Sequence, residues 1–312
     1  MASRTDSRRK KLVSQASLPR LQRGLWSLRL RIAQALGLLF PFKMHVWIDW
    51  LLADAPREFV PARRFLGFSL FLAACRSRAH RQLLVFGSTI VPELDILRPL
   101  VGAGFHVLDI GANLGCLALP LSSWVGRNGK VECWEPDPDN YGELTNNLRR
   151  NGVTNVTCHQ SALGDTDRRA RFRRGLNGEV SDHGDIEVPL HRLDNAATGR
   201  VDLIKIDVEG FEGQVLAGAE ATILRDKPIL FVEVHPLLAS PWTHDALFRW
   251  LAGTGAQVQA FMQVTPRTLL GKIRQRYARS TRTTEAESLP NLIAECTAGR
   301  QTSVFWLVAS WP

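Results

Sequence analysis

The sequence contains no C-x-x-C pair and no long uninterrupted apolar run. Its five cysteines, at positions 75, 116, 133, 158 and 296, are odd in number and irregularly spaced. This pattern indicates neither a disulfide framework nor a thiolate zinc site, so we expect a reducing, cytoplasmic environment. The apolar stretch 32–48 is interrupted by Pro41 and Lys43, and the stretch 65–75 is too short to cross a bilayer. A secretory signal is not expected, because no clean apolar segment with a small-residue cleavage site follows the charged start.

Excess positive charge is also missing from most of the chain. The formal net charge is +9, but residues 1–31 hold nine Lys and Arg against one acid, Asp6. The other 281 residues carry 30 basic and 29 acidic side chains. Enzymes that act on nucleic acids usually spread basic residues over their binding face, so we expect no nucleic-acid partner. A second basic cluster, from Arg267 to Arg282, contains no acid and is expected on a solvated loop.

The composition is that of a globular protein, with 45% hydrophobic and 22% charged residues. A chain of 312 residues is long enough for about two domains. Residues 1–84 have helical and irregular patterns, and residues 85–312 alternate short β-rich runs with helical periodicity. We therefore predict a basic, helical N-terminal extension (1–84) and one α/β domain (85–312).

The extension contains an amphipathic helix. One face carries apolar residues, and the opposite face carries Arg20, Arg23, Ser27, Arg31 and Gln34. The apolar face comprises Leu21, Leu25, Leu28, Ile32, Leu36 and Leu39. Two interpretations remain open: peripheral contact with an anionic membrane, or docking of the helix on the chain's own catalytic domain.

The α/β domain is predicted to contain a mostly parallel sheet with helices between its strands. Strands are expected at 105–110, 130–134, 156–160, 201–207 and 229–234, with two antiparallel edge strands at 258–264 and 303–309. Helices are expected at 92–100, 116–125, from Pro138 to the Asn151-Gly152 stop, 211–224 and 243–251. A hairpin-like region is expected at 170–173 and 185–190.

The strand that ends at Ile110 leads into a glycine-containing turn, Gly111-Ala-Asn-Leu-Gly115, which opens a helix. Glycine lets a backbone pass close to a ligand. The dinucleotide pattern G-x-G-x-x-G is absent because Asn113 occupies the place of its second glycine, which argues against a nicotinamide oxidoreductase. Glu135 terminates the adjacent strand about 20 residues after the turn, where an acid can accept hydrogen bonds from both hydroxyls of a ribose. The sequence therefore predicts a nucleoside site.

Four motifs follow one another along the chain: Asp109-Ile-Gly-Ala-Asn-Leu-Gly115, Trp134-Glu-Pro-Asp-Pro138, Lys205-Ile-Asp-Val-Glu-Gly210 with Phe211-Glu212, and Glu233-Val-His-Pro236. Together they resemble the FkbM family of S-adenosylmethionine-dependent methyltransferases. The resemblance implies a class I (Rossmann-like) methyltransferase fold with a seven-stranded sheet. It also implies S-adenosyl-L-methionine as cofactor and O-methylation of a hydroxyl on a sugar, glycan or natural-product small molecule.

The resemblance also implies roles for individual residues. Asp109, Gly111, Asn113 and Gly115 would line the methionine end of the cofactor, and Glu135 would hold its ribose. Ser161 and Ala162 would lie against the adenine. Asp207, at the carboxyl end of its strand, would lie at the methyl donor and could meet the ammonium group of the cofactor.

Methyl transfer to an aliphatic hydroxyl requires a base that removes the proton. The candidates are Asp207, Glu209, Glu233 and His235, which follow two neighbouring strands. Of these, His235 has the unperturbed pKa best suited to neutral pH. His235 could instead only cap its strand, Glu209 could only stabilise the following helix, and the four side chains together could hold a divalent metal. We predict no metal, and two alternatives to O-methylation stay open: N-methylation on the same fold, and a non-catalytic nucleoside-binding module.

Overall fold

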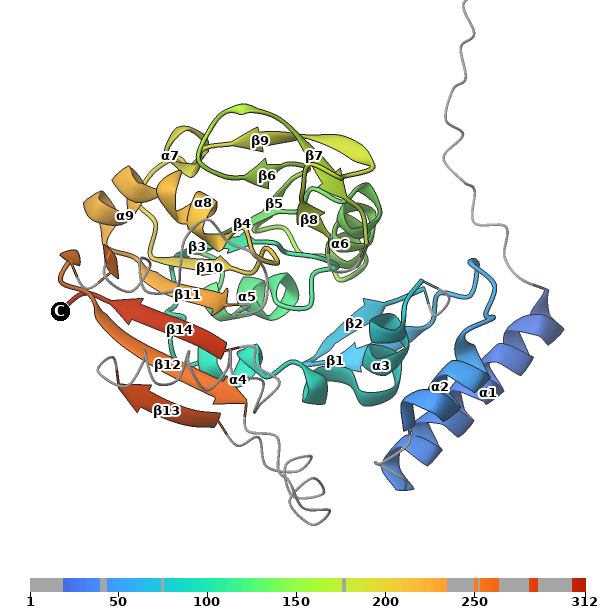
Figure 1. Cartoon of the computed structure of the whole chain (residues 1–312). Helices are drawn as coiled ribbons and strands as arrows, with labels where there is room; N and C mark the ends of the chain where they lie inside the picture. Colours follow the sequence, from blue (N-terminus) through green and yellow to red (C-terminus); the bar gives the residue numbers. More distant parts are fainter. Residues whose placement is uncertain are drawn as a thin grey trace, which may run out of the picture. The chain divides into compact units, whose positions relative to one another are not determined.

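The computed structural model describes residues 19–39, 44–73, 76–175, 178–234, 250–251, 253–263, 281–285 and 305–312. The chain divides into two compact units (Figure 1). The first unit comprises Met1–Arg63 and Phe71–Phe86, and the second comprises Arg64–Leu70 and Gly87–Pro312. The second unit contains all four motifs.

The first unit is built from three helices: α1 (Arg20–Leu39), α2 (Met44–Leu52) and α3 (Arg78–Phe86). On α1, Leu30 and Ala33 are buried, so the face that packs within this unit differs from the predicted apolar face. The carboxylate of Asp49 on α2 pairs with Arg78 at 2.8 Å and with Arg81 at 2.7 Å on α3. Among the helices that the structure describes, none combines the length and the apolar character needed to cross a membrane.

A β-hairpin, which the sequence patterns did not predict, lies between α2 and α3. Strands β1 (Ala62–Phe65) and β2 (Phe68–Phe71) pair as a two-stranded sheet. The two connecting residues, Leu66 and Gly67, have φ of 49° and 91°. Two successive positive φ values match the right-handed twist of a tight hairpin turn. The prediction that residues 1–84 are helical and irregular therefore missed a short strand pair.

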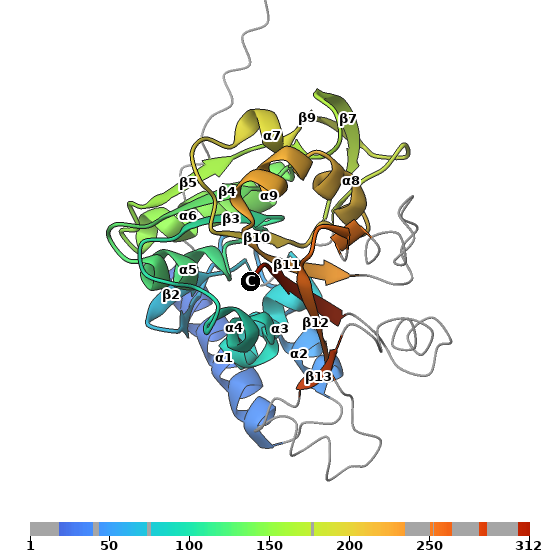
Figure 2. The same cartoon turned by 90° about the vertical axis from the view of Figure 1, so that its left-hand side faces the viewer.

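The second unit is organised around an eight-stranded sheet with strand order β13-β12-β14-β11-β10-β3-β4-β5 (Figures 1 and 2). The strands β5, β4, β3, β10 and β11 are parallel, and β14 runs antiparallel between β11 and β12. Seven of these strands confirm the predicted class I fold. Their bounds are β3 (His106–Ile110), β4 (Lys130–Trp134), β5 (Val156–His159), β10 (Leu203–Ile206), β11 (Ile229–Val234), β12 (Gln257–Gln263) and β14 (Phe305–Ser310).

The eighth strand, β13 (Thr281–Glu285), pairs antiparallel with the outer side of β12. Arg282 lies in this strand, opposite Met262, so its placement on a solvated loop was wrong. The sequence Thr-Arg-Thr-Thr is polar, but its β-branched threonines suit an edge strand. The rest of the second basic cluster lies outside the described residues.

Helices connect the strands: η1 (Gly87–Ile90, a 3₁₀ turn), α4 (Glu93–Leu97), α5 (Ala118–Val125), α6 (Pro138–Arg150), α7 (Leu193–Ala196), α8 (Glu212–Ala217) and α9 (Glu220–Asp226). The predicted ends of α6 are confirmed, because the Asp137 carboxylate accepts from the amides of Asp139 and Asn140, and Asn151 caps the other end. Of the predicted helix 243–251, positions 243–249 lie outside the described residues.

The single helix predicted at 211–224 was wrong, because α8 ends at Ala217 and α9 begins at Glu220. Gly218 lies at the break. A Cβ on Gly218 would collide with the backbone carbonyl of Gly164, and the Gly218 carbonyl accepts a hydrogen bond from the amide of Asp194 at 2.9 Å. The close approach of another loop therefore interrupts the helix, and helical periodicity does not report such a contact.

A second, four-stranded sheet with order β6-β9-β7-β8 contains the predicted hairpin-like region. Its strands are β6 (Ala162–Leu163), β7 (Arg168–Arg173), β8 (Glu179–Val180) and β9 (Ile186–His191). On β7, the buried Ala170 and Phe172 alternate with exposed arginines. One face of this sheet packs on its own small core, and the other presents basic side chains to solvent.

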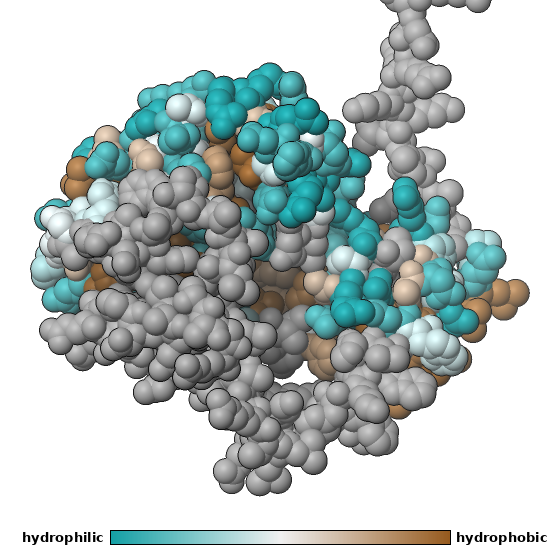
Figure 3. All heavy atoms as spheres, viewed as in Figure 1, coloured by the Kyte–Doolittle hydropathy of each residue, from teal (hydrophilic) through white to brown (hydrophobic). Residues whose placement is uncertain are grey.

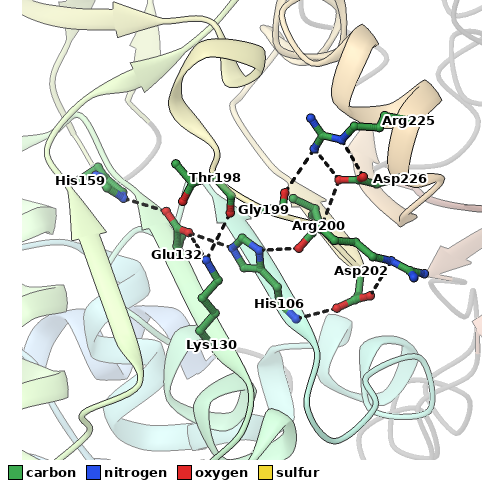
Figure 4. Close-up of polar contacts among 11 residues, drawn as sticks. His106, Lys130, Glu132, His159, Thr198, Gly199, Arg200, Asp202, Arg225 and Asp226 are labelled. Atoms are coloured by element: carbon green, nitrogen blue, oxygen red, sulfur yellow. Dashed lines mark hydrogen bonds and ion pairs between the residues drawn. The ribbon is translucent and has the colours of Figure 1, made fainter.

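A polar network joins the amino-terminal ends of β3 and β4 to the loop before β10 (Figure 4). The carboxylate of Glu132 contacts His106 Nε2 at 2.9 Å, Lys130 Nζ at 3.2 Å and His159 Nε2 at 3.2 Å. These partners hold the pKa of Glu132 well below its usual range. His106 also contacts the carbonyl of Arg200 through Nδ1 at 2.8 Å. The network thus links the neighbouring strands β3, β4 and β5 to the loop before β10.

Candidate functional site

A pocket lies where the parallel strands β3, β4 and β10 end. Its wall is formed by residues that directly follow these strands, together with side chains from the loop after β5 and from the four-stranded sheet. It encloses about 560 Å³ of space between atoms, part of it open to solvent. In open α/β sheets, ligands bind outside the carboxyl ends of the strands. The position of the pocket therefore agrees with the site predicted from the sequence.

The turn after β3 forms one side of the pocket. Gly111 lines it, with φ of 76°, and a Cβ there would collide with the carbonyl oxygen of Asp207. Asn113 also lines the pocket, with φ of 51°, and its side-chain oxygen accepts from the amide of Leu114 at 2.9 Å. Gly115 is absent from the pocket wall as described, and a Cβ there would press on Leu144 of α6. The glycines are thus required by contacts inside the protein, whereas the sequence suggested the approach of a ligand.

Glu135 follows β4 and lies on the pocket wall with only 4% of its surface exposed. One carboxylate oxygen accepts from the amide of Asn113 at 2.8 Å, and the other accepts from the amide of Asp137 at 2.9 Å. Burial raises the pKa of Glu135 to about 7, although these two hydrogen bonds oppose the shift. Each carboxylate oxygen can accept more than one hydrogen bond, so both retain capacity for hydroxyl donors.

The chain beyond Glu135 is held in place by the cap of α6. One oxygen of the Asp137 carboxylate caps the helix, and the other accepts from the amide of Gly175 at 3.0 Å. The side chain of Asn140 donates to the carbonyl of Gly175 at 3.1 Å. These contacts link α6 to the segment between β7 and β8, so the four-stranded sheet is anchored beside the pocket.

Ser161, in the loop after β5, and Ala162, the first residue of β6, lie on the pocket wall, where both are buried. Apolar side chains complete this part of the wall: Trp134, Leu163, Phe172, Val180 and Phe211. Sequence reasoning did not assign these five to the site. Trp134 precedes Glu135 in the second motif and Phe211 belongs to the third, so only these two of the five lie within a motif.

Beneath the pocket, Lys205 is buried in the sheet with 2% of its surface exposed. Its Nζ lies 3.1 Å from Asp109 Oδ1 and 3.7 Å from Asp207 Oδ2, and it donates to the carbonyl of Gly111 at 2.9 Å. The two carboxylates raise the pKa of Lys205 despite its burial. Asp109 is fully buried and is not part of the pocket wall as described. Lys205 therefore links the two acidic residues and the glycine turn.

The candidate bases do not all lie at the pocket. Asp207 and Glu209 line it, and Glu209 has a left-handed backbone with φ of 53°. Glu233 is buried behind it and accepts from the indole nitrogen of Trp306 at 2.9 Å. Burial, together with the nearby carboxylates of Asp207 and Glu93, raises the pKa of Glu233 to about 10, so it is uncharged at neutral pH. His235 lies outside the described residues.

The described part of the chain holds no group of three or more His, Cys, Asp or Glu side chains arranged to bind a metal ion. The carboxyl group of Glu93, on α4, joins the buried acidic groups near Lys205, and its pKa is raised by burial and by Asp207. No motif signalled this residue, because α4 lies outside the four motifs. Of the four side chains that the sequence presented as converging, Asp207 and Glu209 therefore lie on the pocket wall, Glu233 is buried behind it, and His235 is outside the described residues.

Comparisons with known proteins bear on this site. Residues 109–258 match the family described as methyltransferase FkbM domain, over just under half of the chain. No curated protein matches the chain.

Solved structures are similar to the chain at low identity. Methyltransferase FkbM from Methylobacillus flagellatus KT is 23% identical with a TM-score of 0.34, over 50% of this chain and 43% of that chain. A SAM-dependent methyltransferase from Aquifex aeolicus is 15% identical with a TM-score of 0.38, over 70% of this chain and 88% of that chain. A precorrin-6y C5,15-methyltransferase from Geobacter metallireducens GS-15 is 13% identical with a TM-score of 0.37, over 70% and 87%. The chain thus spans less than half of the Methylobacillus protein.

Proposed function

Residues 109–258 match the methyltransferase FkbM domain, the family predicted from the four motifs, and on this premise we propose that the protein is an S-adenosylmethionine-dependent O-methyltransferase. We propose a hydroxyl of a sugar, glycan or natural-product small molecule as the acceptor. The observation that carries the proposal is the carboxylate of Glu135, oriented by two backbone amides on the wall of a pocket at the carboxyl edge of the sheet.

The pocket fits the nucleoside part of this cofactor. The carboxylate of Glu135 can accept from both ribose hydroxyls while it keeps its two backbone hydrogen bonds. Ser161, Ala162 and the apolar side chains around them suit a planar base. When bound, S-adenosylmethionine supplies a methyl group on a positively charged sulfur.

We assign the methionine end of the cofactor to the turn after β3, with Gly111 and Asn113 on the pocket wall. Asp109 and Gly115 would support this turn from behind the pocket wall. Asp109 does so through its ion pair with Lys205, and Gly115 does so by allowing α6 to pack closely. Asp207 lines the pocket beside Gly111, so its carboxylate can meet an ammonium group.

The chain itself must orient the acceptor oxygen and take its proton. Asp207 and Glu209 are the described carboxylates on the pocket wall that suit this role. Glu233 is protonated at neutral pH and so serves better as a neutral partner of Trp306. His235 directly follows β11 in the sequence and remains a proposed base.

We propose that residues 85–312 form the methyltransferase domain and that the N-terminal extension contacts an anionic membrane. On α1, four apolar side chains at helical spacing are exposed: Leu21 by 90%, Leu25 by 52%, Leu28 by 54% and Ile32 by 42%. Figure 3 shows hydrophobic surface where Figure 1 draws α1. Residues 1–31 also carry nine basic side chains against one acid. An exposed apolar stripe beside basic residues suits a helix that lies in the membrane interface.

The proposed activity is tested by calorimetric titration of the full chain with S-adenosylmethionine and, separately, with NADH. We expect micromolar binding of S-adenosylmethionine alone. Glu135→Ala should weaken it by tenfold or more, because the ribose loses a charged acceptor of its hydrogen bonds. Glu187→Ala is the matched control, since Glu187 is an exposed carboxylate that pairs with Arg169 away from the pocket. Binding of NADH, or equal affinities for the two variants, would contradict the proposal.

A further inference from the structure

A second cavity adjoins the proposed cofactor pocket. It is a polar groove between strands β7 and β8 on one side and the amino-terminal part of α8 on the other, with about 1040 Å³ of space between atoms, part of it open to solvent. The two cavities share three lining residues: Val180, Glu209 and Phe211. Figure 3 shows that the molecular surface over the four-stranded sheet is largely hydrophilic. A small molecule in the groove would therefore meet the cofactor pocket at these three side chains.

Glu209 lies at the junction of the two cavities. It is not a glycine or an asparagine, yet its φ is 53°, in the left-handed region. Left-handed backbone at such a residue is strained and persists where the surrounding fold imposes it, often at functional sites. Glu209 follows Asp207 by two residues. The segment after β10 therefore presents the carboxylate of Asp207 to the cofactor pocket and that of Glu209 to both cavities.

The groove contains as many cationic as anionic side chains. Arg168, Arg171 and Arg173 line it together with three carboxylates. The carboxylates are those of Glu179, Asp182 and Glu209. The guanidinium of Arg173 pairs with Glu179 at 2.8 Å, and that of Arg171 donates to the carbonyl of Gly184 at 2.7 Å and 3.0 Å. A lining with balanced charge and many donors and acceptors matches a neutral molecule rich in hydroxyl groups better than an anion.

Two further side chains offer hydrogen-bonding capacity in the groove. Among the described residues, Arg168 makes one long hydrogen bond, to the carbonyl of Arg169 at 3.4 Å. Gln214, on α8, has a buried side-chain oxygen that accepts no hydrogen bond from the described residues. Buried polar atoms normally have a partner, so such an atom on a cavity wall points to a ligand or to a rearrangement of the amide when a ligand binds. A hydroxyl group can supply the missing donor.

From these observations we infer that the groove between β7, β8 and α8 is the acceptor site, that its ligand is a neutral polyhydroxylated molecule, and that Glu209 contacts the hydroxyl that receives the methyl group. This inference rests on the proposed function. The acceptor oxygen would become bonded to the methyl carbon as the carbon–sulfur bond breaks and its electron pair returns to sulfur, while the hydroxyl proton passes to a carboxylate at the junction.

The test uses the full chain and S-adenosylmethionine labelled in its methyl group. The acceptor probe is a small-molecule and glycan extract of the source cells, separated by anion exchange into a neutral and an acidic fraction. We expect label to enter the neutral fraction. At limiting extract, Arg168→Ala and Gln214→Ala should transfer label about tenfold more slowly, because each loses a hydrogen bond to the acceptor. The rate should recover at saturating extract, and the calorimetric Kd for S-adenosylmethionine should stay unchanged.

Arg169→Ala is the matched control, because Arg169 is the next residue on β7, is exposed, and pairs with Glu187 away from the groove. Unfolding midpoints of all variants identify any that fail to fold. Groove variants that match Arg169→Ala at limiting extract would overturn the assignment of the groove. Label that enters only the acidic fraction would overturn the inference that the acceptor is a neutral molecule. Binding of S-adenosylmethionine with no transfer to either fraction would count against the proposed function itself, and so against the acceptor site.

Discussion

Glu135 combines a buried carboxyl group with two backbone amides that favour its charged form. Burial prevails and raises its pKa from 4.5 to about 7. The folded protein therefore keeps a proton that the unfolded chain has lost between these two pH values. As the pH rises through this window, the contribution of Glu135 to the free energy of unfolding falls. A group held near its pKa at neutral pH is sensitive to any ligand that prefers one of its two forms.

This property predicts the pH dependence of cofactor binding. Ribose hydroxyls donate to the charged carboxylate, so the affinity for S-adenosylmethionine should fall as the pH drops below about 7 and Glu135 takes up a proton, by up to tenfold per unit. Calorimetric Kd values between pH 5.5 and 8.5 test this expectation. Glu135→Gln serves as the control, because it keeps the shape of the side chain and removes the titration. Profiles that run parallel for the two proteins would show that Glu135 does not supply the dependence.

The ammonium group of Lys205 balances negative charge in the interior of the protein, where an unpaired carboxylate is energetically costly. Its ammonium group lies 3.1 Å from Asp109, which is fully buried. Lys205→Met should lower the free energy of unfolding by about 3–5 kcal/mol, because a buried charge loses its partner. Asp109→Asn combined with Lys205→Met should cost less than the sum of the two single changes, since neither charge is then left alone. Urea denaturation measures all three variants, and strictly additive losses would contradict the pairing.

At the level of helices and strands, contacts from elsewhere in the chain decide where an element ends. The strands β4 and β11 and the helix α6 begin and end where their patterns predict, because local signals fix them: short, almost continuously buried β-rich runs for the strands, and the Asp137 cap and Asn151 stop for the helix. Gly218 divides the predicted helix 211–224 because the backbone of Gly164 passes against it. The strands β1 and β2 were missed because each is only four residues long, and the edge strand β13 was missed because all five of its residues are polar.

Two glycine substitutions distinguish the effect of helix propensity on stability from the effect of a tertiary contact. Gly142 lies within α6 with nothing near the position of a Cβ, so Gly142→Ala should raise the free energy of unfolding by about 0.5–1 kcal/mol. Gly218→Ala should lower it by about 1–3 kcal/mol, because the methyl group has no room beside the Gly164 carbonyl. Thermal unfolding of the two variants measures the difference. Equal shifts of the unfolding midpoint would show that the Gly164 loop yields without cost.

At the scale of the whole molecule, α1 is apolar on two sides. Leu30 and Ala33 pack within the first unit, and the stripe from Leu21 to Ile32 is exposed. A helix that serves only its own unit needs one apolar face. The second face, next to a strongly basic segment, is the physical basis for the proposed membrane contact.

Vesicle sedimentation tests this contact on the full chain. We expect binding to vesicles that contain phosphatidylserine, and weaker binding at high salt or to phosphatidylcholine alone. Replacement of Leu21, Leu25 and Leu28 by Gln should weaken binding at least tenfold, because each leucine contributes about 1.5–3 kcal/mol when buried. Leu224→Gln is the control, since Leu224 is 51% exposed on α9. A triple variant that binds like this control would refute a role for the stripe.

The sequence by itself determined the class of fold, the family and the end of the sheet that carries the site. Strand periodicity, the glycine turn and the spacing of Glu135 are local patterns that can be read from the sequence. In a parallel sheet the residues that follow the strands meet at one edge, so these patterns also locate the site. Tertiary structure decided which acids face the pocket. Asp207 and Glu209 line it, whereas Asp109 and Glu233 are buried behind it. The groove beside Glu209 was also beyond sequence reasoning, because β7, β8 and α8 meet there only after the chain has folded, and no residue spacing records that meeting.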